Sequence, residues 1–196
     1  MPAPGGAAEL EHGAALLERA VSYARGCLAL VGPGPFDAAT PCPGWDLCAL
    51  LQHMDDSLAA FTEAAELGSV RLVGPVASTE PAGAVARLLA RACALLAAWT
   101  DPPYPTVRVA GHPVHTDLLA GAGALEIAVH GWDVATACGR SRPLPPMLAL
   151  DLLDLVPVLV DDADRPARFG FPVAVRRSAA PSARLLAAVG RVSPGT

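Results

Sequence analysis

The chain has 196 residues, of which 53% are hydrophobic and 5% aromatic, and its net charge is -5. This length fits one domain with a sizeable core, and the abundance of Ala and Leu indicates that helices build that core. The acidic balance and the absence of a basic cluster argue against nucleic acid as a partner. All 14 basic residues are arginines, so Schiff-base chemistry, which needs a lysine, is excluded.

The N-terminal sequence MPAPGGAAELEHG lacks the basic and apolar regions of a secretory signal, and apolar runs elsewhere are too short to cross a bilayer. We therefore expect a cytoplasmic protein that does not interact with a membrane. Five cysteines without a C-x-x-C pair predict neither a disulfide framework nor a zinc ribbon. We expect a single domain over residues 1–196, with residues 1–7 and 192–196 disordered.

Apolar residues spaced by three and four positions predict two helices in the first third of the chain. The first lies within residues 8–31, and the sequence GPGPFDAATPCPG interrupts the pattern after it. The second helix then continues to about Leu67. Thr79 and Pro81 are suited to the cap and first turn of a third helix over residues 82–99.

The second half of the chain begins with an alternating stretch, TVRVAGHPVH, which predicts a short β-hairpin or extended arm with its turn at Ala110 and Gly111. A fourth helix starts near Thr116 and stops at Gly139. A shorter helix within residues 145–162, an extended segment and a small final helix follow. The fold predicted is mainly α, a four-helix bundle with a small C-terminal extension.

Glu126 and His130 lie one helical turn apart in LEIAVHGWDV, a stretch with few other polar residues. Positions i and i+4 are neighbours on a helix, about 5 to 6 Å apart, so the two side chains project to one point and could ligate one cation. A carboxylate in an apolar interior requires a partner, because its burial alone costs several kcal/mol. Two simpler interpretations remain: the carboxylate is hydrogen-bonded to its own histidine, or both groups face water.

His53 is the best candidate for a third ligand, because it lies beside the apolar positions Leu50 and Met54 of the second helix. A histidine at such a position is also compatible with an ordinary core residue. Two imidazoles and a carboxylate from two helices would leave coordination positions open, as in catalytic metal sites. Zinc is the first expectation, with nickel and iron(II) as alternatives.

Two motifs support a resemblance to a known family. TPCPGWDLCALLQHM, residues 40–54, has the pattern T-P-C-P-x-W followed by a histidine eight residues after the tryptophan, and EIAVHGWDVATACGR, residues 126–140, has the pattern E-x-x-x-H-G-W-D-x-A. Both patterns resemble those of the DinB-like superfamily of metal-binding helical bundles. The similarity is to the actinobacterial branch that includes mycothiol-dependent maleylpyruvate isomerase, and it extends to the C-terminal sequence.

The resemblance implies metal ligands at His53, Glu126 and His130. It also implies a bundle with up-down-down-up connectivity and a long crossover between the second and third helices. Relatives use a low-molecular-weight thiol, mycothiol or bacillithiol. We therefore expect a metal-dependent thiol transferase or isomerase that acts on a small electrophilic metabolite. The alternatives are a non-catalytic metal-binding module, or a biosynthetic enzyme that uses the metal as a Lewis acid or to activate water without a thiol.

Residues around these motifs have weaker expected roles. Asp133, three residues after His130, is a candidate acceptor for a ligand imidazole, and the alternative is a hydrogen bond to nearby backbone. Trp45 and Trp132 are expected to frame the pocket. Cys42 and His115 are secondary catalytic candidates, although no activating neighbour of Cys42 is visible in the sequence. We expect a small-molecule substrate and a monomer or homodimer, with neither the substrate nor the oligomeric state specified further.

Overall fold

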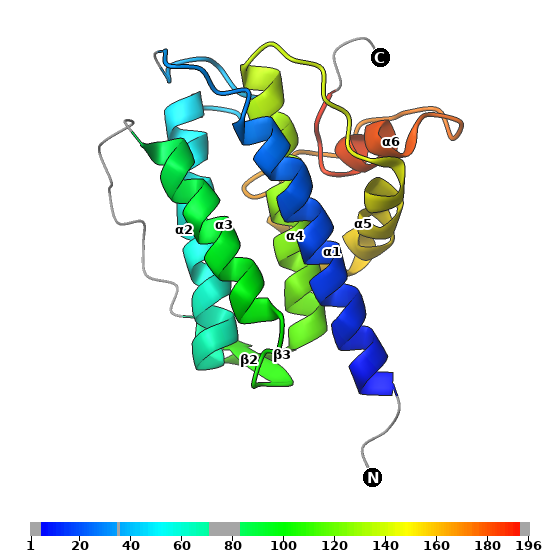
Figure 1. The fold of residues 1–196 in the computed structure, drawn as a ribbon. Helices are drawn as coiled ribbons and strands as arrows, with labels where there is room; N and C mark the ends of the chain where they lie inside the picture. The colour runs from blue at the N-terminus through cyan, green and yellow to red at the C-terminus, as the bar shows by residue number, and fades with distance from the viewer. Residues whose placement is uncertain (1–4, 35, 71–82, 193–196) are drawn as a thin grey trace. The chain divides into compact units, whose positions relative to one another are not determined.

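The structure is a computed structural model that describes residues 5–34, 36–70 and 83–192 (Figure 1). The fold comprises two compact units, Met1–Arg140 and Ser141–Thr196. The organisation of the whole chain as one domain therefore stays a prediction. The described residues include no helix with the length and apolar character needed to cross a membrane.

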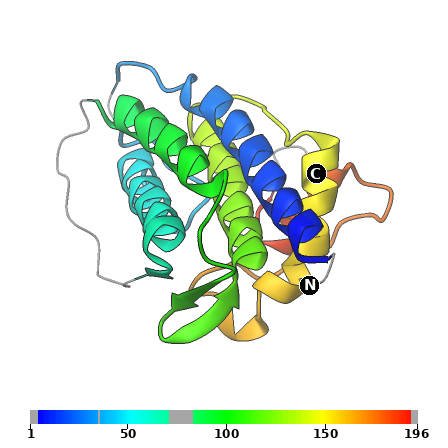
Figure 2. The same ribbon diagram turned by 60° about the horizontal axis from the view of Figure 1, so that its bottom comes forward.

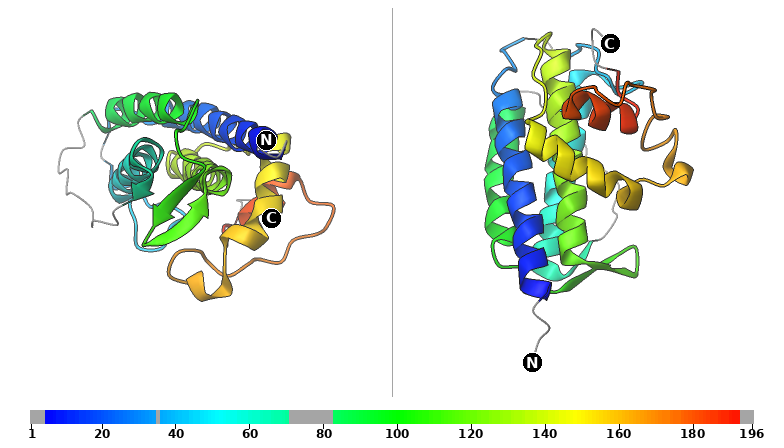
Figure 3. Two further views of the ribbon diagram at one scale, coloured as in Figure 1. Left: turned by 90° about the horizontal axis from the view of Figure 1, so that it is seen from below. Right: turned by 90° about the vertical axis from the view of Figure 1, so that its right-hand side faces the viewer.

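The first unit is a bundle of four helices: α1 (Gly5–Leu28), α2 (Leu47–Leu67), α3 (Ala84–Trp99) and α4 (Thr116–Ala137). Helix α1 runs in one direction, α2 and α3 both run back, and α4 returns parallel to α1 (Figure 1). Helix α1 packs chiefly on α4 and α2 chiefly on α3, and contacts between α2 and α4 close the bundle (Figure 3). The up-down-down-up bundle that the family resemblance implies is confirmed.

A small sheet lies at the end of the bundle where α4 begins (Figure 2). The predicted hairpin is confirmed as β2 (Thr106–Val109) paired antiparallel with β3 (His112–His115). Its two loop residues, Ala110 and Gly111, have φ values of 48° and 85°, as a tight two-residue turn requires. A third strand, β1 (Ser69–Val70), pairs parallel with β2 and was not predicted.

The helix ends differ from the prediction by a few residues. Helix α1 begins at Gly5, inside the segment 1–7 that we expected to be disordered, whereas residues 1–4 and 193–196 lie outside the described residues. Thr79 and Pro81, the predicted start of the third helix, also lie outside them. At the end of α4 the prediction is confirmed, because Gly139 has a φ of 68° immediately after the C-cap residue.

Helix α4 is buried on nearly every side, as expected for a central helix whose sequence is apolar all round. Small residues allow α1 to approach it closely. A Cβ at Gly131 would lie 3.1 Å from the Cα atom of Ala24, and a Cβ at Gly123 would lie 3.4 Å from Leu17. Contact with α1 covers one face of α4, so the polar side chains of α4 form their contacts on its other faces.

The second unit contains α5 (Pro146–Leu159), the short 3-10 helix η1 (Asp162–Asp164) and α6 (Pro181–Ala188). Helix α5 packs on α6. The guanidinium of Arg165 donates hydrogen bonds to the carbonyl oxygens of Gly170 and Ala188. These bonds fix the loop between the helices, and the unit forms the small C-terminal extension expected from the sequence.

Candidate metal centre

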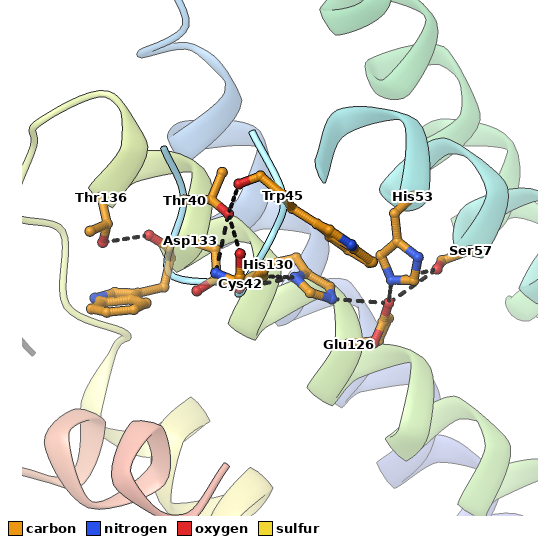
Figure 4. Close-up of polar contacts among 10 residues, drawn as sticks. Thr40, Cys42, Trp45, His53, Ser57, Glu126, His130, Asp133 and Thr136 are labelled. Atoms are coloured by element: carbon orange, nitrogen blue, oxygen red, sulfur yellow. Dashed lines mark hydrogen bonds and ion pairs between the residues drawn. The ribbon is translucent and has the colours of Figure 1, made fainter. Parts of the chain in front are cut away.

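Three acidic or imidazole side chains follow one face of α4 at intervals of four and three residues: Glu126, His130 and Asp133. Nε2 of His130 lies 3.3 Å from Oε1 of Glu126, and Nδ1 of the same ring lies 3.0 Å from Oδ2 of Asp133. The imidazole therefore sits between two carboxylates (Figure 4). This order follows from helical periodicity, which places positions 126, 130 and 133 on a single stripe.

His53 reaches the same place from α2. Its Nε2 atom lies 2.5 Å from Oε1 of Glu126, the oxygen that also faces His130 (Figure 4). One turn further along α2, the hydroxyl of Ser57 donates to this oxygen at 3.1 Å. His53 and Ser57, one turn apart on α2, therefore both face the carboxylate of Glu126. The imidazoles of His53 and His130 both direct their Nε2 atoms toward it.

The loop before α2 closes one side of the site. The hydroxyl of Thr40 accepts a hydrogen bond from the backbone N–H of Cys42 at 3.1 Å and donates to the carbonyl oxygen of Trp45 at 2.9 Å. Gly44 has a φ of 79°, a left-handed conformation that suits glycine. Asp46 then caps α2 by accepting from the N–H of Ala49 at 2.8 Å. The motif T-P-C-P-x-W therefore specifies a hydrogen-bonded turn and the start of a helix.

This turn brings Trp45 and Cys42 to opposite edges of the histidine pair. The Trp45 ring lies 4.7 Å from the ring of His53 and 6.2 Å from that of His130, measured between centroids. The Sγ atom of Cys42 lies 3.2 Å from Oδ2 of Asp133 and 3.9 Å from Nδ1 of His130. Trp45 therefore forms a wall beside the imidazoles, and Cys42 belongs to the group around Asp133 (Figure 4).

The charges of this cluster stabilise one another. Burial alone would favour a neutral Glu126, but the charge of His130 and hydrogen bonds with His130 and His53 hold the pKa of Glu126 well below its ordinary value. Burial likewise favours a neutral His130, yet the charge of Glu126 and hydrogen bonds with Asp133, Cys42 and Glu126 raise its pKa well above the ordinary value. These interactions favour the charged forms of both residues, a carboxylate at Glu126 and an imidazolium at His130.

The donor atoms form two groups that could each hold a metal ion, His53–Glu126–His130 and Cys42–His130–Asp133, with all atoms of a group within 4.8 Å of one another. In a tetrahedral site with bonds of about 2.0 to 2.1 Å, nitrogen and oxygen ligands lie roughly 3.3 Å apart. In the first group the two nitrogens lie 2.5 and 3.3 Å from the Glu126 oxygen, so small side-chain movements suffice to admit an ion. Two imidazoles and one carboxylate are a donor set suited to zinc, nickel or iron(II).

The two groups differ in their access to solvent. In the first, the side chains of His53 and Glu126 are 35% and 25% exposed. In the second, Cys42, Asp133 and His130 are all buried. The first group can therefore receive an ion together with an outside molecule, whereas the second is closed.

Other candidates from the sequence lie elsewhere in the fold. Trp132 is buried, but it is two positions beyond His130 and so points to a different side of α4, away from the stripe of ligands. His115 is exposed before the start of α4, eleven residues ahead of Glu126, which corresponds to roughly 16 Å along a helix. The structure does not bring either side chain to the cluster, and their expected roles remain untested predictions.

Two contacts of the site escaped the sequence analysis. No role was predicted for Ser57, although its position four residues after His53 places the two on a shared helix face. The contact between Cys42 and Asp133 joins residues 91 positions apart, and nothing in the local sequence indicates it. The expected acceptor role of Asp133 toward His130, in contrast, matches the observed contact between them.

Comparison with known protein families gives a match. A family model described as the mycothiol maleylpyruvate isomerase N-terminal domain matches residues 17–135, which is more than half of the chain. The matched region includes Cys42, His53, Glu126, His130 and Asp133. No curated protein and no solved structure matches the chain.

Proposed function

The chain belongs to the family of mycothiol maleylpyruvate isomerase N-terminal domains, and we propose that it is an enzyme in which His53, Glu126 and His130 bind a divalent metal and activate a mycothiol-type thiol. The thiolate then attacks a small electrophilic metabolite. The reaction is an isomerisation or an S-transfer, and zinc is the first candidate for the metal. The fit of the donor set to such an ion supports this assignment.

The observation that carries the proposal is the convergence of three donor atoms from two helices on one partly exposed point. Nε2 of His53 and Nε2 of His130 both face the same oxygen of Glu126, at 2.5 and 3.3 Å. Three protein ligands with an accessible side are typical of catalytic metal sites, whereas structural zinc sites normally use four protein ligands. The access at His53 and Glu126 leaves room for a thiol.

A bound divalent cation would lower the pKa of a coordinated thiol, so that the nucleophilic thiolate exists at neutral pH. The surrounding residues orient the ligands for this role. Asp133 accepts from Nδ1 of His130 and thereby directs the lone pair of Nε2 toward the site. Ser57 donates to Glu126 and restrains the carboxylate. Trp45 covers the imidazoles and provides an apolar wall for the incoming molecule.

The thiolate sulfur forms a bond to an electrophilic carbon of an unsaturated substrate, and the electrons of the double bond move toward the group that activates it. Rotation about the resulting single bond, followed by loss of the thiolate and return of the electron pair to the double bond, would give the isomer and regenerate the thiolate. If a proton is added instead, the product keeps the sulfur and the reaction is an S-transfer. Both outcomes require the same activated thiol, so the proposal covers them together.

Turnover by the metal-loaded protein tests the proposal, with mycothiol and a small unsaturated acid of cis configuration as probes. We expect thiol binding to release a proton, and isomer or thioether to form at a rate that falls at least about 100-fold in His53→Ala, as for loss of a metal ligand. His112→Ala is the matched control, because this exposed histidine of the hairpin lies outside the cluster, and it should keep the wild-type rate.

Three results would contradict the proposed reaction. Tight capture of the thiol without any turnover would indicate a binding module. Hydrolysis that proceeds without thiol would indicate activation of water instead. Equal rates in His53→Ala and wild type would show that the metal ligands are assigned wrongly.

A further inference from the structure

A second set of donor atoms meets at the other nitrogen of the His130 ring. Nδ1 of His130, Oδ2 of Asp133 and Sγ of Cys42 form a triangle with sides of 3.0, 3.2 and 3.9 Å. These residues are 8%, 0% and 7% exposed, so the triangle is closed to solvent. The cysteine comes from the turn before α2, whereas both other residues lie on α4.

The triangle has the dimensions of a metal site that includes a thiolate. With a metal to sulfur bond of about 2.3 Å and bonds of about 2.0 to 2.1 Å to nitrogen and oxygen, tetrahedral ligands lie roughly 3.3 to 3.6 Å apart. Each observed side lies within about 0.4 Å of that range. Sulfur, nitrogen and a carboxylate oxygen together favour a thiophilic cation over a hard one such as Mn²⁺.

We propose that Cys42, Asp133 and His130 form a second metal site for a thiophilic cation, and that this site competes with His53 and Glu126 for His130. A neutral imidazole has one lone pair, on Nε2 or on Nδ1, and carries its proton on the other nitrogen. An ion at Nδ1 therefore leaves a proton on Nε2, which donates to Glu126. The Cys42 thiol loses its proton to solvent when the sulfur binds the ion.

This competition gives the second site a regulatory consequence. A cation bound by Cys42 removes His130 from the first site, so that only His53 and Glu126 remain to hold a catalytic metal. The competition rests on the proposed function of the first site, but the existence of the second site does not. Thiophilic cations should accordingly inhibit the enzyme by occupying a buried position that no substrate reaches.

Cadmium is a suitable probe because it binds thiolates strongly and does not change its oxidation state. One equivalent of Cd²⁺ added to the reduced, metal-free full-length chain should produce ultraviolet thiolate-to-cadmium absorption. We expect Cys42→Ser to lose this absorption and Glu126→Gln to keep it. Cys48→Ser and Cys138→Ser, which alter half-buried cysteines outside the cluster, are the matched controls and should keep it.

Cadmium X-ray absorption of the wild type provides a measurement that needs no variant. It should show one sulfur neighbour together with nitrogen and oxygen. The second site would be refuted if the X-ray absorption spectrum showed only nitrogen and oxygen neighbours, or if the thiolate absorption survived in Cys42→Ser. Neither result affects the first site, whose own test is the loss of turnover in His53→Ala.

Competition is measured with Mn²⁺, a hard ion expected at the first site. Preloading with one equivalent of Cd²⁺ should weaken Mn²⁺ binding at least about 10-fold in the wild type, as for loss of an imidazole ligand, while the cadmium keeps its sulfur neighbour in the X-ray absorption spectrum. Unchanged Mn²⁺ affinity in cadmium-loaded wild type would overturn the competition.

Discussion

The two edges of the His130 ring lie in contrasting surroundings. The Nε2 edge faces Glu126 and His53, whose side chains are partly open to solvent. The Nδ1 edge faces Asp133, which is fully buried. The open edge faces partly exposed side chains, whereas the sealed edge holds the ring in one orientation. The comparison shows how one buried histidine can keep a fixed orientation while its Nε2 atom faces partly exposed side chains.

The sealed edge is also the one at which a lone charge would be most destabilising. A buried carboxylate without a partner costs several kcal/mol, because it loses its interaction with water. Asp133 is compensated by the His130 imidazole at 3.0 Å and by the Cys42 thiol at 3.2 Å. At the open edge, Glu126 is partly exposed to water, so losing one of its hydrogen-bond partners costs less free energy there.

The largest effect is expected from Glu126→Gln, which removes the carboxylate of Glu126 at the open edge while keeping the size of the side chain. We expect metal affinity to fall by about 3 kcal/mol, roughly 100-fold or more, because a charged ligand becomes neutral. Calorimetric metal titration measures the loss, and circular dichroism should show helicity close to that of the wild type. Glu66→Gln, at an exposed position of α2, is the control. Retention of wild-type affinity by Glu126→Gln would refute the assignment.

A smaller effect is expected from Asp133→Asn at the sealed edge. The amide still fills the space but accepts less strongly from Nδ1 of His130, so metal affinity should fall by about 10- to 100-fold. The same titration measures it, with the exposed Asp101→Asn as the control. If Asp133→Asn matches Glu126→Gln in its loss, Asp133 contributes as much as Glu126 to the metal bound at the open edge, and the distinction between the two edges fails.

The smallest effect is a pH dependence of the metal-free protein. Because the pKa of His130 is raised above 6.5 in the folded state, the folded chain keeps a proton that the unfolded chain releases. Stability should therefore fall as the pH rises from about 6.5 toward the raised pKa, with a slope of at most about 1.4 kcal/mol per pH unit. Below about 4.5 the depressed pKa of Glu126 produces the opposite trend, and stability falls as the pH drops.

Urea unfolding of the metal-free protein at a series of pH values measures both trends. His130→Gln has no imidazole to titrate and should lose the decline above pH 6.5. Metal affinity should rise as the pH rises over this range, because the ion competes with the proton for His130. A flat profile in the wild type would mean that His130 does not keep its proton between the two carboxylates.

Regular patterns within single elements were predictable from the sequence. The spacing of apolar residues indicated the first two helices of the bundle, start and stop signals bounded the other two, and Gly139 marked the end of α4. The hairpin turn at Ala110 and Gly111 followed from alternation and turn chemistry. Strand β1 was missed, because two residues carry no pattern and its partner β2 lies 39 positions away.

The candidate site also combines features that were predictable from the local sequence with features that were not. Glu126, His130 and Asp133 share a face because they are separated by four and three residues on one helix, which is a local property. His53 was chosen from a motif and from its apolar neighbours, and the structure brings its Nε2 atom to Glu126 across 73 positions. The weak expectation for Trp132 arose because a motif says nothing about the side of the helix on which a tryptophan lies.

The sequence by itself determined the helices, the hairpin and the ligand stripe on α4, because each depends on bonds and contacts between residues a few positions apart. Only the tertiary structure decided that Cys42 lies against Asp133, that Ser57 donates to Glu126, and that one edge of His130 is open while the other is sealed. These features depend on how α2 and its preceding turn pack on α4. Such packing is the sum of many weak contacts between distant residues, and no local pattern encodes it.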